Sequence, residues 1–405
     1  MLKFLAILLI SLIFQYSLNS QPSQQDSLFV VQQVSDLIQA QKYASAHELL
    51  ENYLEEFGIN NHFICLMVDN ALRHHYLHEN YDYFYLKNAE NSSGKPAKEA
   101  QPQIARLRHP RRLLEKVIRQ KPDKALAYKL LGDYYNIQLG DLSHFEFAQN
   151  GSIKELEEKC FYYYTKAEKL GVSDRETCRW LGDYYNSRNQ PETAEKYYQK
   201  NIEKSPPDAI SLFQLAELSF QKKQYTQAYN YSSKSLKFLK PEDLYLRYDA
   251  LRMAAISLKE LGEETRFLQL INECLKTNSE AQEAYIDLID YYISNGDTTI
   301  VEHTFTEMFL NNPFDRPGYN RLEKYIVSSG HFKFADSLFD RMILKYENWD
   351  EALANIYWSK GNIAYHRNLT SEASSFWELS RNYMRKYLPE DHSILKQVGE
   401  LSRKN

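Results

Sequence analysis

Apolar residues recur at three- and four-residue spacing, in blocks about as long as a helix. The block around Cys178 includes Leu181 and Tyr185, and the next block holds Ala194 and Tyr198. Residues with this spacing lie on one face of a helix. Turn-forming residues such as Gly, Asn and Asp stand between later blocks. The pattern therefore predicts amphipathic helices in pairs, with a short turn inside each pair.

One hexapeptide occurs twice in the chain. Leu-Gly-Asp-Tyr-Tyr-Asn occupies residues 131–136 and again residues 181–186. Six identical residues are improbable by chance, so they indicate a repeated structural unit. Units in such an array bury their apolar faces against their neighbours. We therefore expect function to reside on a long surface rather than in a single pocket.

The two copies share an order of large and small positions. They are Tyr128, Leu131, Gly132 and Tyr135 in the first copy, and Cys178, Leu181, Gly182, Tyr185, Ala194, Tyr198 and Pro206 in the second. This order resembles the tetratricopeptide repeat, a helix-turn-helix unit of about 34 residues with small residues where its helices touch. The resemblance implies an all-α fold, a right-handed α-solenoid of about nine such repeats.

Two positions of the motif, which we call the Gly182 slot and the Ala194 slot, recur along the chain with the same spacing. Successive members of each lie 34 to 39 residues apart, as their numbers show. Because both slots shift in step, we expect the helix-pair frame to continue to the C-terminal region. The Gly182 slot recurs at Ala216, Ala255, Ile289, Glu323 and Gly361, and the Ala194 slot recurs at Ala228, Phe267, Val301, Ala335 and Ala373.

The domain organisation follows from this frame. We expect degenerate repeats over 27–122 with a loop at 88–102, then repeats over 125–208 with an insertion at 139–154. Regular repeats follow over 209–390. A capping helix and tail are expected over 391–405, because the last unit of an array needs a polar outer face.

Composition agrees with helices and argues against one class of partner. Hydrophobic residues make up 43%, while Gly (13) and Pro (12) are sparse, which disfavours strand-and-turn architectures. Tyr is abundant at 32, and it suits half-buried positions, with the ring inside and the hydroxyl near water. The formal net charge is only −5, so nothing points to nucleic acid.

The first twenty residues differ from the rest. Lys3 precedes an apolar run at 4–14 that only Ser11 interrupts, and polar residues follow. This is the pattern of a secretory signal peptide, which we expect to be cleaved after Ser20. An uncleaved membrane anchor is the alternative, although the run is shorter than the roughly 20 apolar residues of a spanning helix. We therefore expect an exported protein, periplasmic or secreted, that contacts membranes only peripherally.

Candidate chemistry is sparse. His74 and His78 would share a face if their segment were helical, yet no third metal ligand has an obvious place. Cys160 and Cys178 would sit near opposite ends of two antiparallel helices, about 10 Å or more apart. A disulfide needs Cα atoms within roughly 7 Å, so we expect free thiols. No nucleophile, phosphate-loop or nucleotide motif appears, and we expect no cofactor and no enzymatic activity.

In proteins of the resembled family, the first helix of each unit lines a groove that holds a peptide or protein segment. The residues that fall on this face are Lys129, Asp133, Asn136, Arg179, Asp183, Asn186, Phe213, Glu217, Phe220, Arg252, Ile256, Lys259, Ile286, Asp290, Ile293, Asn320, Lys324, Trp358, Asn362 and Tyr365. Acidic residues occupy slots where some family members use Lys and Asn to hold a terminal carboxylate, which suits basic or hydrogen-bonding segments instead. The alternative is that pairs such as Lys129 and Asp133 neutralise each other on their helix.

The sequence thus predicts a non-catalytic scaffold that binds a partner protein or peptide. Exposed aromatic anchors, Phe213, Phe220 and Trp358, would carry binding energy, whereas aromatics at helical spacing can equally be core. One alternative is a carbohydrate- or small-ligand-binding exported protein, which requires these aromatics and Tyr365 to gather in one pocket. The other is an enzyme built on the two excursions, with His109, His144 and Glu146 as its only candidate residues.

Overall fold

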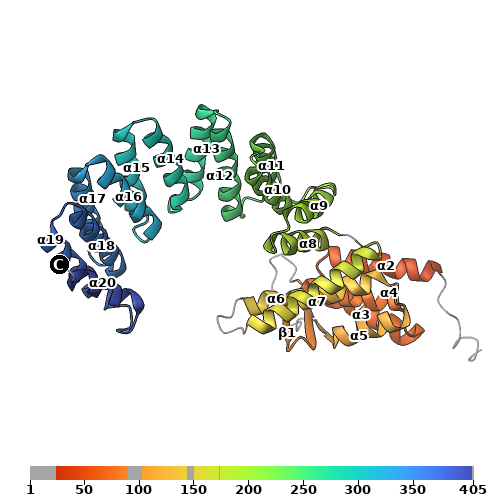
Figure 1. Ribbon diagram of the computed structural model, residues 1–405. Coiled ribbons are helices and arrows are strands. Elements are labelled where there is room, and N and C mark those ends of the chain that lie inside the picture. The colour runs from red at the N-terminus through yellow and green to blue at the C-terminus, as the bar shows by residue number, and fades with distance from the viewer. Residues whose placement is uncertain (1–23, 90–102, 144–149, 173, 404–405) are drawn as a thin grey trace, which may run out of the picture. The chain divides into compact units, whose positions relative to one another are not determined.

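The computed structural model describes residues 24–89, 103–143, 150–172 and 174–403. The chain divides into two compact units, unit 1 over residues 1–197 and unit 2 over residues 198–405. Both consist of tandem antiparallel helix pairs, so the all-α helical-repeat fold is confirmed (Figure 1). The proposed signal segment lies outside the described residues.

Unit 1 holds the first helix pairs and one small sheet. Its helices are α2 (Gln24–Gln39), α3 (Tyr43–Phe57), α4 (Asn61–His74), α5 (Pro110–Gln120), α6 (Ala125–Ser143), α7 (Asn150–Lys169), α8 (Arg175–Ser187) and the first part of α9 (Pro191–Ile202). Consecutive helices from α2 to α8 pack against each other, and α4 also contacts α6.

Unit 2 continues the pairs to the last described helix. They are α10 (Ala209–Gln221) and α11 (Tyr225–Phe238), α12 (Leu244–Glu260) and α13 (Glu264–Thr277), α14 (Gln282–Ser294) and α15 (Thr298–Asn311), α16 (Arg316–Ser329) and α17 (Phe332–Lys345), α18 (Asp350–His366) and α19 (Thr370–Met384), and finally α20 (Ser393–Arg403). The first helices of successive pairs also touch, as α10 does α12 and α16 does α18.

Burial confirms the Ala194 slot, and in the Gly182 slot every member is buried except Glu323, which is half-buried. Every member of the Ala194 slot is at most 1% exposed: Cys160, Ala194, Ala228, Phe267, Val301, Ala335 and Ala373. The residues four positions later, one helical turn on, are at most 2% exposed: Tyr164, Tyr198, Ser232, Ile271, Phe305, Phe339 and Trp377. A helix that is buried at both positions along one stripe must pack that stripe against its partner.

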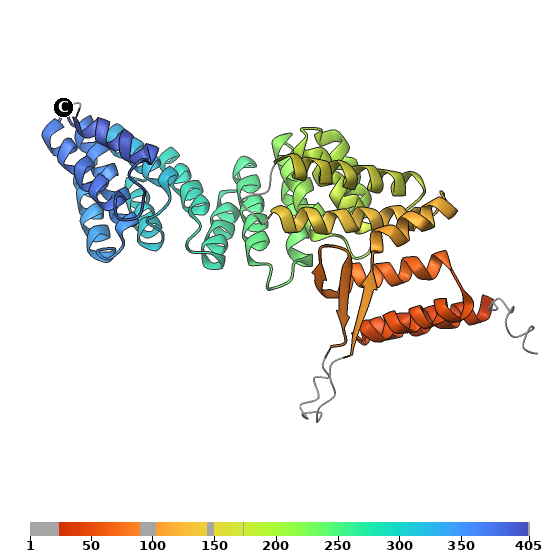
Figure 2. The ribbon, with the colours of Figure 1, turned by 90° about the horizontal axis from the view of Figure 1, so that it is seen from below.

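A three-stranded antiparallel sheet departs from the expected helix pair upstream of residue 122. It comprises β1 (His75–Glu79), β2 (Tyr83–Lys87) and β3 (Ile104–Arg108), in the order β1-β2-β3 (Figure 2). The residues of β2 and β3 alternate between buried and accessible, which is the period of a strand. Aromatic and aliphatic residues with that alternation favour a strand over a helix.

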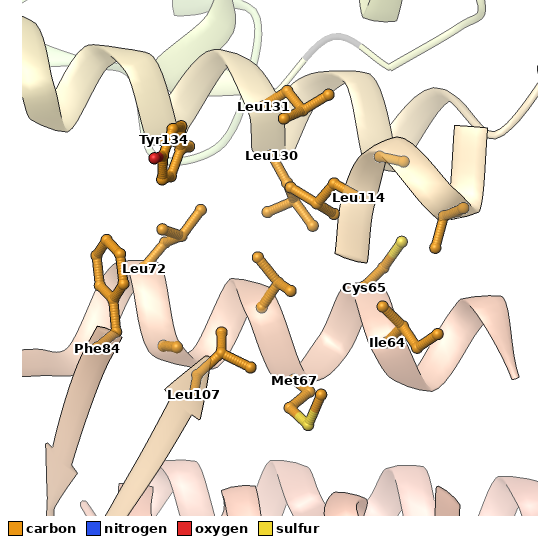
Figure 3. Packing of buried hydrophobic residues seen from close by; sticks show 14 of the residues in the cluster. Ile64, Cys65, Met67, Leu72, Phe84, Leu107, Leu114, Leu130, Leu131 and Tyr134 are labelled. Atoms are coloured by element: carbon orange, nitrogen blue, oxygen red, sulfur yellow. The ribbon is translucent and has the colours of Figure 1, made fainter. Parts of the chain in front are cut away.

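The turn between β1 and β2 has the geometry of a hairpin. Asn80 and Tyr81 both have positive φ, +48° and +58°. Two central residues of this kind form the turn whose twist matches a two-stranded hairpin. The amide of Asp82 donates to Glu79 O at 3.0 Å and closes it. Phe84 and Leu107 then point from the strands toward Leu72 and Tyr134 of the unit 1 core (Figure 3).

The expected insertion at 139–154 is in large part helix. Residues 139–143 extend α6 to 19 residues and residues 150–154 open α7, which has 20. Both helices are longer than the 13 residues of α8 and the 12 of α9. The extra residues therefore lengthen an ordinary pair, while 144–149 lie outside the described residues.

Asp side chains start several of the first helices. Asp174, Asp208 and Asp315 cap α8, α10 and α16, each accepting a hydrogen bond from a backbone amide three residues on. Such caps satisfy an amide that the helix leaves unpaired. Among the described helices, none combines the length and the apolar composition needed to cross a membrane.

Candidate functional site

Three hollows lie along first helices of successive pairs. The first, in unit 1, has a volume of about 570 Å³ and is formed by α4, α6 and α8 with one residue of α7. We call it the unit 1 hollow. Its lining residues are Leu72, Arg73, His74, Asp133, Asn136, Ile137, Tyr164, Glu176, Arg179, Trp180 and Asp183.

Unit 2 holds the other two. The acidic hollow has a volume of about 500 Å³ and is lined by Tyr245, Tyr248, Asp249, Asn278, Glu280, Ala281, Gln282, Glu283, Ile286, Asn312, Asp315 and Pro317. The mixed hollow has a volume of about 760 Å³ and is lined by Asp290, Ile293, Asn320, Arg321, Glu323, Lys324, Tyr325, Val327, Ser328 and His366. The acidic hollow is formed by the first turns of α12 and the starts of α14 and α16. The mixed hollow is formed by α14, α16 and the end of α18.

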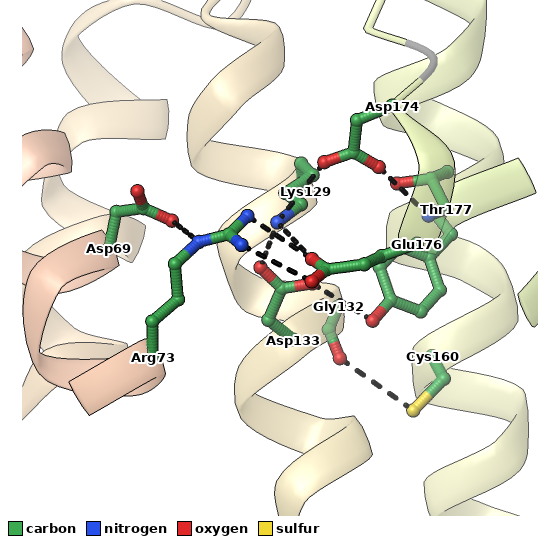
Figure 4. Close-up of polar contacts among 10 residues, drawn as sticks. Asp69, Arg73, Lys129, Gly132, Asp133, Cys160, Asp174, Glu176 and Thr177 are labelled. Carbon is green, nitrogen blue, oxygen red and sulfur yellow. Dashed lines mark hydrogen bonds and ion pairs between the residues drawn. The ribbon is translucent and has the colours of Figure 1, made fainter. Parts of the chain in front are cut away.

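A buried lysine organises the wall of the unit 1 hollow. The side chain of Lys129 is 1% exposed. Its Nζ lies 2.5 Å from Asp133 Oδ2, and 3.2 Å from both Asp174 Oδ2 and Glu176 Oε2 (Figure 4). The hydroxyl of Tyr164 donates to Asp133 Oδ1 at 3.0 Å. Residues of α6, α7 and α8 are therefore joined around one cation.

Arg73 extends this cluster to α4. Its Nε donates to Asp69 Oδ1 at 2.8 Å. Its two terminal nitrogens donate to the two carboxylate oxygens of Glu176 at 3.2 and 3.1 Å (Figure 4). A bidentate arrangement of this kind sets the relative orientation of both side chains. The cluster thus pins three successive first helices, α4, α6 and α8, to one another.

The cluster holds more carboxylates than cations, and this shifts their pKa values. Burial raises the pKa of Asp133 to about 6, against the attraction of Lys129, and the charge of Glu176 adds to the rise. Burial by itself lowers the pKa of Lys129, but the charges of Asp133 and Asp174 outweigh it and the net shift is upward. The two pKa shifts have one explanation. Lys129 stays charged among the carboxylates, and the enclosed carboxylate of Asp133 holds its proton more tightly than an ordinary Asp.

The structure brings several predicted groove residues of unit 1 together. Asp133, Asn136, Arg179 and Asp183 all line the unit 1 hollow. Asn136 accepts a hydrogen bond from Trp180 Nε1 at 3.0 Å. The predicted place of Lys129 on the groove face is corrected by the structure. Its side chain is enclosed by carboxylates and is only 1% exposed. Asn186 is half-buried on α8, outside the residues that line the hollow.

The sequence predicted Phe213 of unit 2 to be an exposed aromatic anchor, and the predicted exposure is wrong. It is only 8% exposed and packs with Leu239 and Ala250. Its position in α10 faces the next helices, which the period alone did not reveal. Phe220 is half-buried and meets the ring of Tyr225 at 5.3 Å between centroids.

Glu217 and Asp290 are partly enclosed acids. Burial, with the charge of Asp249, raises the pKa of Glu217. Asp290 lines the mixed hollow and forms an ion pair with Arg321. Ile293, Asn320 and Lys324 line the same hollow, and Ile286 lines the acidic hollow.

The predicted residues of α18 take three different roles. The guanidinium of Arg316 lies over the ring of Trp358, 4.3 Å from its centroid. Asn362 donates to Glu323 Oε2 at 2.9 Å and accepts from Trp377 Nε1 at 3.1 Å. Tyr365 is 48% exposed. Phe213 and Phe220 lie on α10, in a different part of unit 2 from Trp358 and Tyr365.

Some lining residues were missed by sequence reasoning. The acidic hollow uses Tyr245, Asp249, Glu283 and Asp315, which lie near helix starts. The predicted face began one turn later, because it was anchored on the small slot at each helix centre. The Asp-x-x-Gly sequence at Asp315, an N-cap pattern, was the one available signal for the start of α16.

The histidine cluster does not share a helical face. His74 ends α4 and stacks on Tyr43 at 4.1 Å, while His75 begins β1. His78 lies on β1, 3.0 Å from Asp141 Oδ2. His109 pairs with Asp82 at 3.2 Å, whereas His144 and Glu146 lie outside the described residues. In the described part of the chain, no three His, Cys, Asp or Glu side chains are grouped as metal ligands.

All four cysteines are buried free thiols. Burial raises the pKa of Cys65 to about 11 and that of Cys160 and Cys274 to about 12. The Sγ of Cys160 lies 3.8 Å from Gly132 O, at the contact of α6 and α7. They act as small apolar residues in helix contacts.

Comparison with known proteins gives partial similarities. No family model matches the chain. A curated relative, the interferon-induced protein with tetratricopeptide repeats 2 of Cricetulus griseus, is 28% identical over 111 residues, which are 27% of this chain. The match spans 24% of that relative's length.

Solved structures of tetratricopeptide-repeat proteins are similar at low sequence identity. YrrB, described as having an unusual peptide-binding site, has a TM-score of 0.34 at 16% identity, over 43% of this chain and 79% of its own. A repeat protein from Parabacteroides merdae has a TM-score of 0.38 at 15% identity, over 72% and 91%. The complex of the yeast Sti1 TPR2AB domain with pHSP90 has a TM-score of 0.24 at 15% identity, over 56% and 96%. The helix-pair register of this chain is established by its own buried slots.

Proposed function

We propose that this protein is a non-catalytic scaffold that binds a partner protein or peptide segment along the first helices of its helix pairs. The observation that carries the proposal is the placement of the three hollows. Each is formed chiefly by first helices of three successive pairs. A segment that crosses such a surface meets polar and apolar side chains from several repeats in turn.

The unit 1 hollow supports binding without large rearrangement. Its wall is held by the Lys129 and Arg73 cluster, whose members come from four helices. A surface that is already ordered loses little conformational entropy on binding. The polar groups that line it, Asn136, Arg179 and Asp183, can pair with backbone or side-chain groups of a segment.

The setting we propose is outside the cytoplasm. The charged start and the apolar run at 4–14 support export and removal of residues 1–20. An envelope or secretory location would place the scaffold among proteins that are assembled after export. This part of the proposal rests on the sequence pattern alone.

The experiment is selection of displayed random peptides against the purified chain, followed by affinity measurements on variants. One variant disrupts each hollow: Asp183→Arg, Ile293→Arg and Glu283→Arg. Two matched charge reversals, Glu158→Arg on α7 and Glu372→Arg on α19, place arginine at exposed positions of second helices. At least one hollow variant should weaken the selected peptides about tenfold or more, and the second-helix variants should not.

The opposite pattern contradicts the proposal. If selected peptides bind every hollow variant as tightly as the unmodified chain, the first helices are not the binding surface. If the second-helix variants weaken binding as strongly as the hollow variants, general charge and not the surface explains it.

A further inference from the structure

The acidic hollow of unit 2 gathers carboxylates without a cation. Asp249, Glu280, Glu283 and Asp315 line it. Among the described residues that form its lining, none is Lys, Arg or His. The other two hollows both contain arginine. A cation among the lining residues is therefore present in the other two hollows and missing here, although the charge of Arg252 nearby partly offsets that of Asp249.

The neighbouring arginines are engaged elsewhere. Arg252 donates to both oxygens of Asp287, at 2.6 and 3.3 Å. Arg316 lies over Trp358 and pairs with Glu323 at 3.5 Å. Burial and the charge of Glu283 raise the pKa of Asp249, and the same two causes act on Asp315. The carboxylates thus repel one another across the hollow.

An unsatisfied acceptor lies beside these carboxylates. Gln282 lines the hollow and is only 5% exposed. Its Nε2 donates to Asn312 O at 2.7 Å, whereas its Oε1 has no hydrogen-bond partner among the described residues. A Cβ at Gly318 would collide with this oxygen and would lie 3.3 Å from Asp315 Oδ2, so the two acceptors border the same small space. A buried carbonyl oxygen without a donor is costly. This oxygen is covered by the first turn of α16, so it adds to the excess of acceptors at this end of the hollow without itself reaching a ligand.

An exposed aromatic side chain stands at the rim. Tyr245 lines the hollow and is 83% exposed, and Leu244 beside it is 55% exposed. A guanidinium stacks readily on an aromatic face, and it carries five N–H donors in a planar fork. The carboxylates that line the hollow can accept hydrogen bonds from the edge of a guanidinium, and the exposed ring of Tyr245 can stack on its face.

Two simpler explanations account for part of the cluster. Asp315 caps α16, and Glu283 lies in the first turn of α14, where a negative charge is stabilising. Neither role explains Asp249, in the second turn of α12, or the unpaired oxygen of Gln282. A metal ion is not the better occupant, because these acids are not grouped as metal ligands in the described residues.

We propose that the acidic hollow binds an arginine side chain of an extended partner segment. The guanidinium donates to the carboxylates of Asp249 and Glu283 and stacks on Tyr245, and neighbouring basic residues of the segment meet Glu280 and Asp315. This deepens the proposed function and rests on it, since it names the chemistry of the segment that one of the three hollows takes.

The test uses the full chain and fluorescein-labelled Gly-Arg-Gly-Arg-Gly-Arg-Gly, with anisotropy as the readout. A second probe replaces each arginine by citrulline, which keeps the shape and removes the charge. The variant pair Asp249→Asn with Glu283→Gln leaves the Asp315 cap intact. The control pair Glu347→Gln with Glu372→Gln changes the net charge equally at exposed positions of unit 2 outside the hollow.

The arginine probe should bind the unmodified chain, and the citrulline probe should bind at least about tenfold more weakly. The hollow pair should weaken the arginine probe by about tenfold or more, while the control pair changes it less than about twofold. Tyr245→Ala should weaken it with no change in the helical circular dichroism.

Three results would overturn the assignment. They are equal affinity of both probes, equal loss in the two variant pairs, or no binding of the arginine probe. If displayed peptides still bind the unit 1 or mixed hollow, this inference alone fails. If no first-helix variant affects any peptide, the proposed function fails with it.

Discussion

The ring of Tyr164 packs so closely against Gly132 that a Cβ at Gly132 would stand 2.5 Å from the nearest ring atom. Trp377 occupies the corresponding place over Gly361 in the pair α18 and α19. In both pairs a large aromatic from the second helix fills the space left by the missing side chain on the first. This contact explains why the first helix carries a small residue at this position, because protein interiors are packed without spare volume.

Gly132→Ala should therefore destabilise the α6–α7 pair by about 1–3 kcal/mol, since either the Tyr164 ring or a helix must shift. Gly140→Ala is the matched control on the same helix, because a Cβ there meets nothing within 4 Å. It should stabilise α6 by up to about 1 kcal/mol through helix propensity. Hydrogen exchange of α6 and α7 peptides measures both. Equal effects of the two substitutions would mean that the slot contact does not matter.

Lys129→Met should cost unit 1 about 3–5 kcal/mol, because it leaves Asp133, Asp174 and Glu176 without their shared cation in an enclosed site. Lys159→Met removes a lysine from the exposed face of α7, where it pairs with Glu155. That control should leave stability nearly unchanged. Hydrogen exchange in α6 and α8 reports the difference. Similar protection in the two variants would show that the cluster adds nothing to unit 1.

The raised pKa of Asp133 predicts a pH dependence. A carboxyl group whose pKa is about 6 in the folded chain, against an ordinary value of 3.8, binds its proton more tightly when folded. Its stabilising contribution is complete below the unfolded pKa and is lost as pH rises through about 6. The stability of the unmodified chain minus that of Asp133→Asn should fall by on the order of 1 kcal/mol from about pH 5 to about pH 7.

Local hydrogen exchange at each pH, corrected for the intrinsic exchange rate, measures this difference. The lowered pKa of Asp174 changes stability only below the ordinary range of a carboxyl group, so it does not contribute between about pH 5 and about pH 7. A difference that stays constant over this range would show that the pKa of Asp133 is not raised in the folded chain.

Phe213→Ala should destabilise unit 2 by about 2–4 kcal/mol, because it removes a buried ring and leaves a cavity beside Leu239 and Ala250. Phe220→Ala removes a half-buried ring and should cost less. Chemical denaturation followed by circular dichroism compares them. A Phe213→Ala chain that is as stable as the unmodified one, yet binds selected peptides poorly, would restore the sequence-based view of Phe213 as a groove anchor.

Export predicts a mature N-terminus. The chain recovered from the exported fraction of its host should begin at Gln21, as read by N-terminal sequencing. Leu9→Arg interrupts the apolar run at 4–14 and should leave the precursor intact and unexported. Recovery of the uncleaved chain from the membrane fraction would instead support the anchor.

The repeat register was open to sequence analysis because it depends on local spacing. Cys160, Ala194 and Ala335 are all completely buried, in helices as different in composition as α7 and α17. The 3.6-residue period of a helix decides which residues share a stripe, whatever the neighbouring helix is. The hairpin after His74 was missed because five-residue strands give short signals, and its pairing with β3 joins segments about 20 residues apart.

The sequence alone determined the helical frame, the paired slots and the first-helix face. Tertiary structure decided what that face offers. Lys129 is enclosed only because Asp174 and Glu176 arrive from another helix, and Phe213 is buried only because α12 packs over it. The acidic hollow likewise exists only where the starts of three helices meet. Charge balance and exposure depend on residues far apart in the chain, so a periodic pattern within one helix does not contain them.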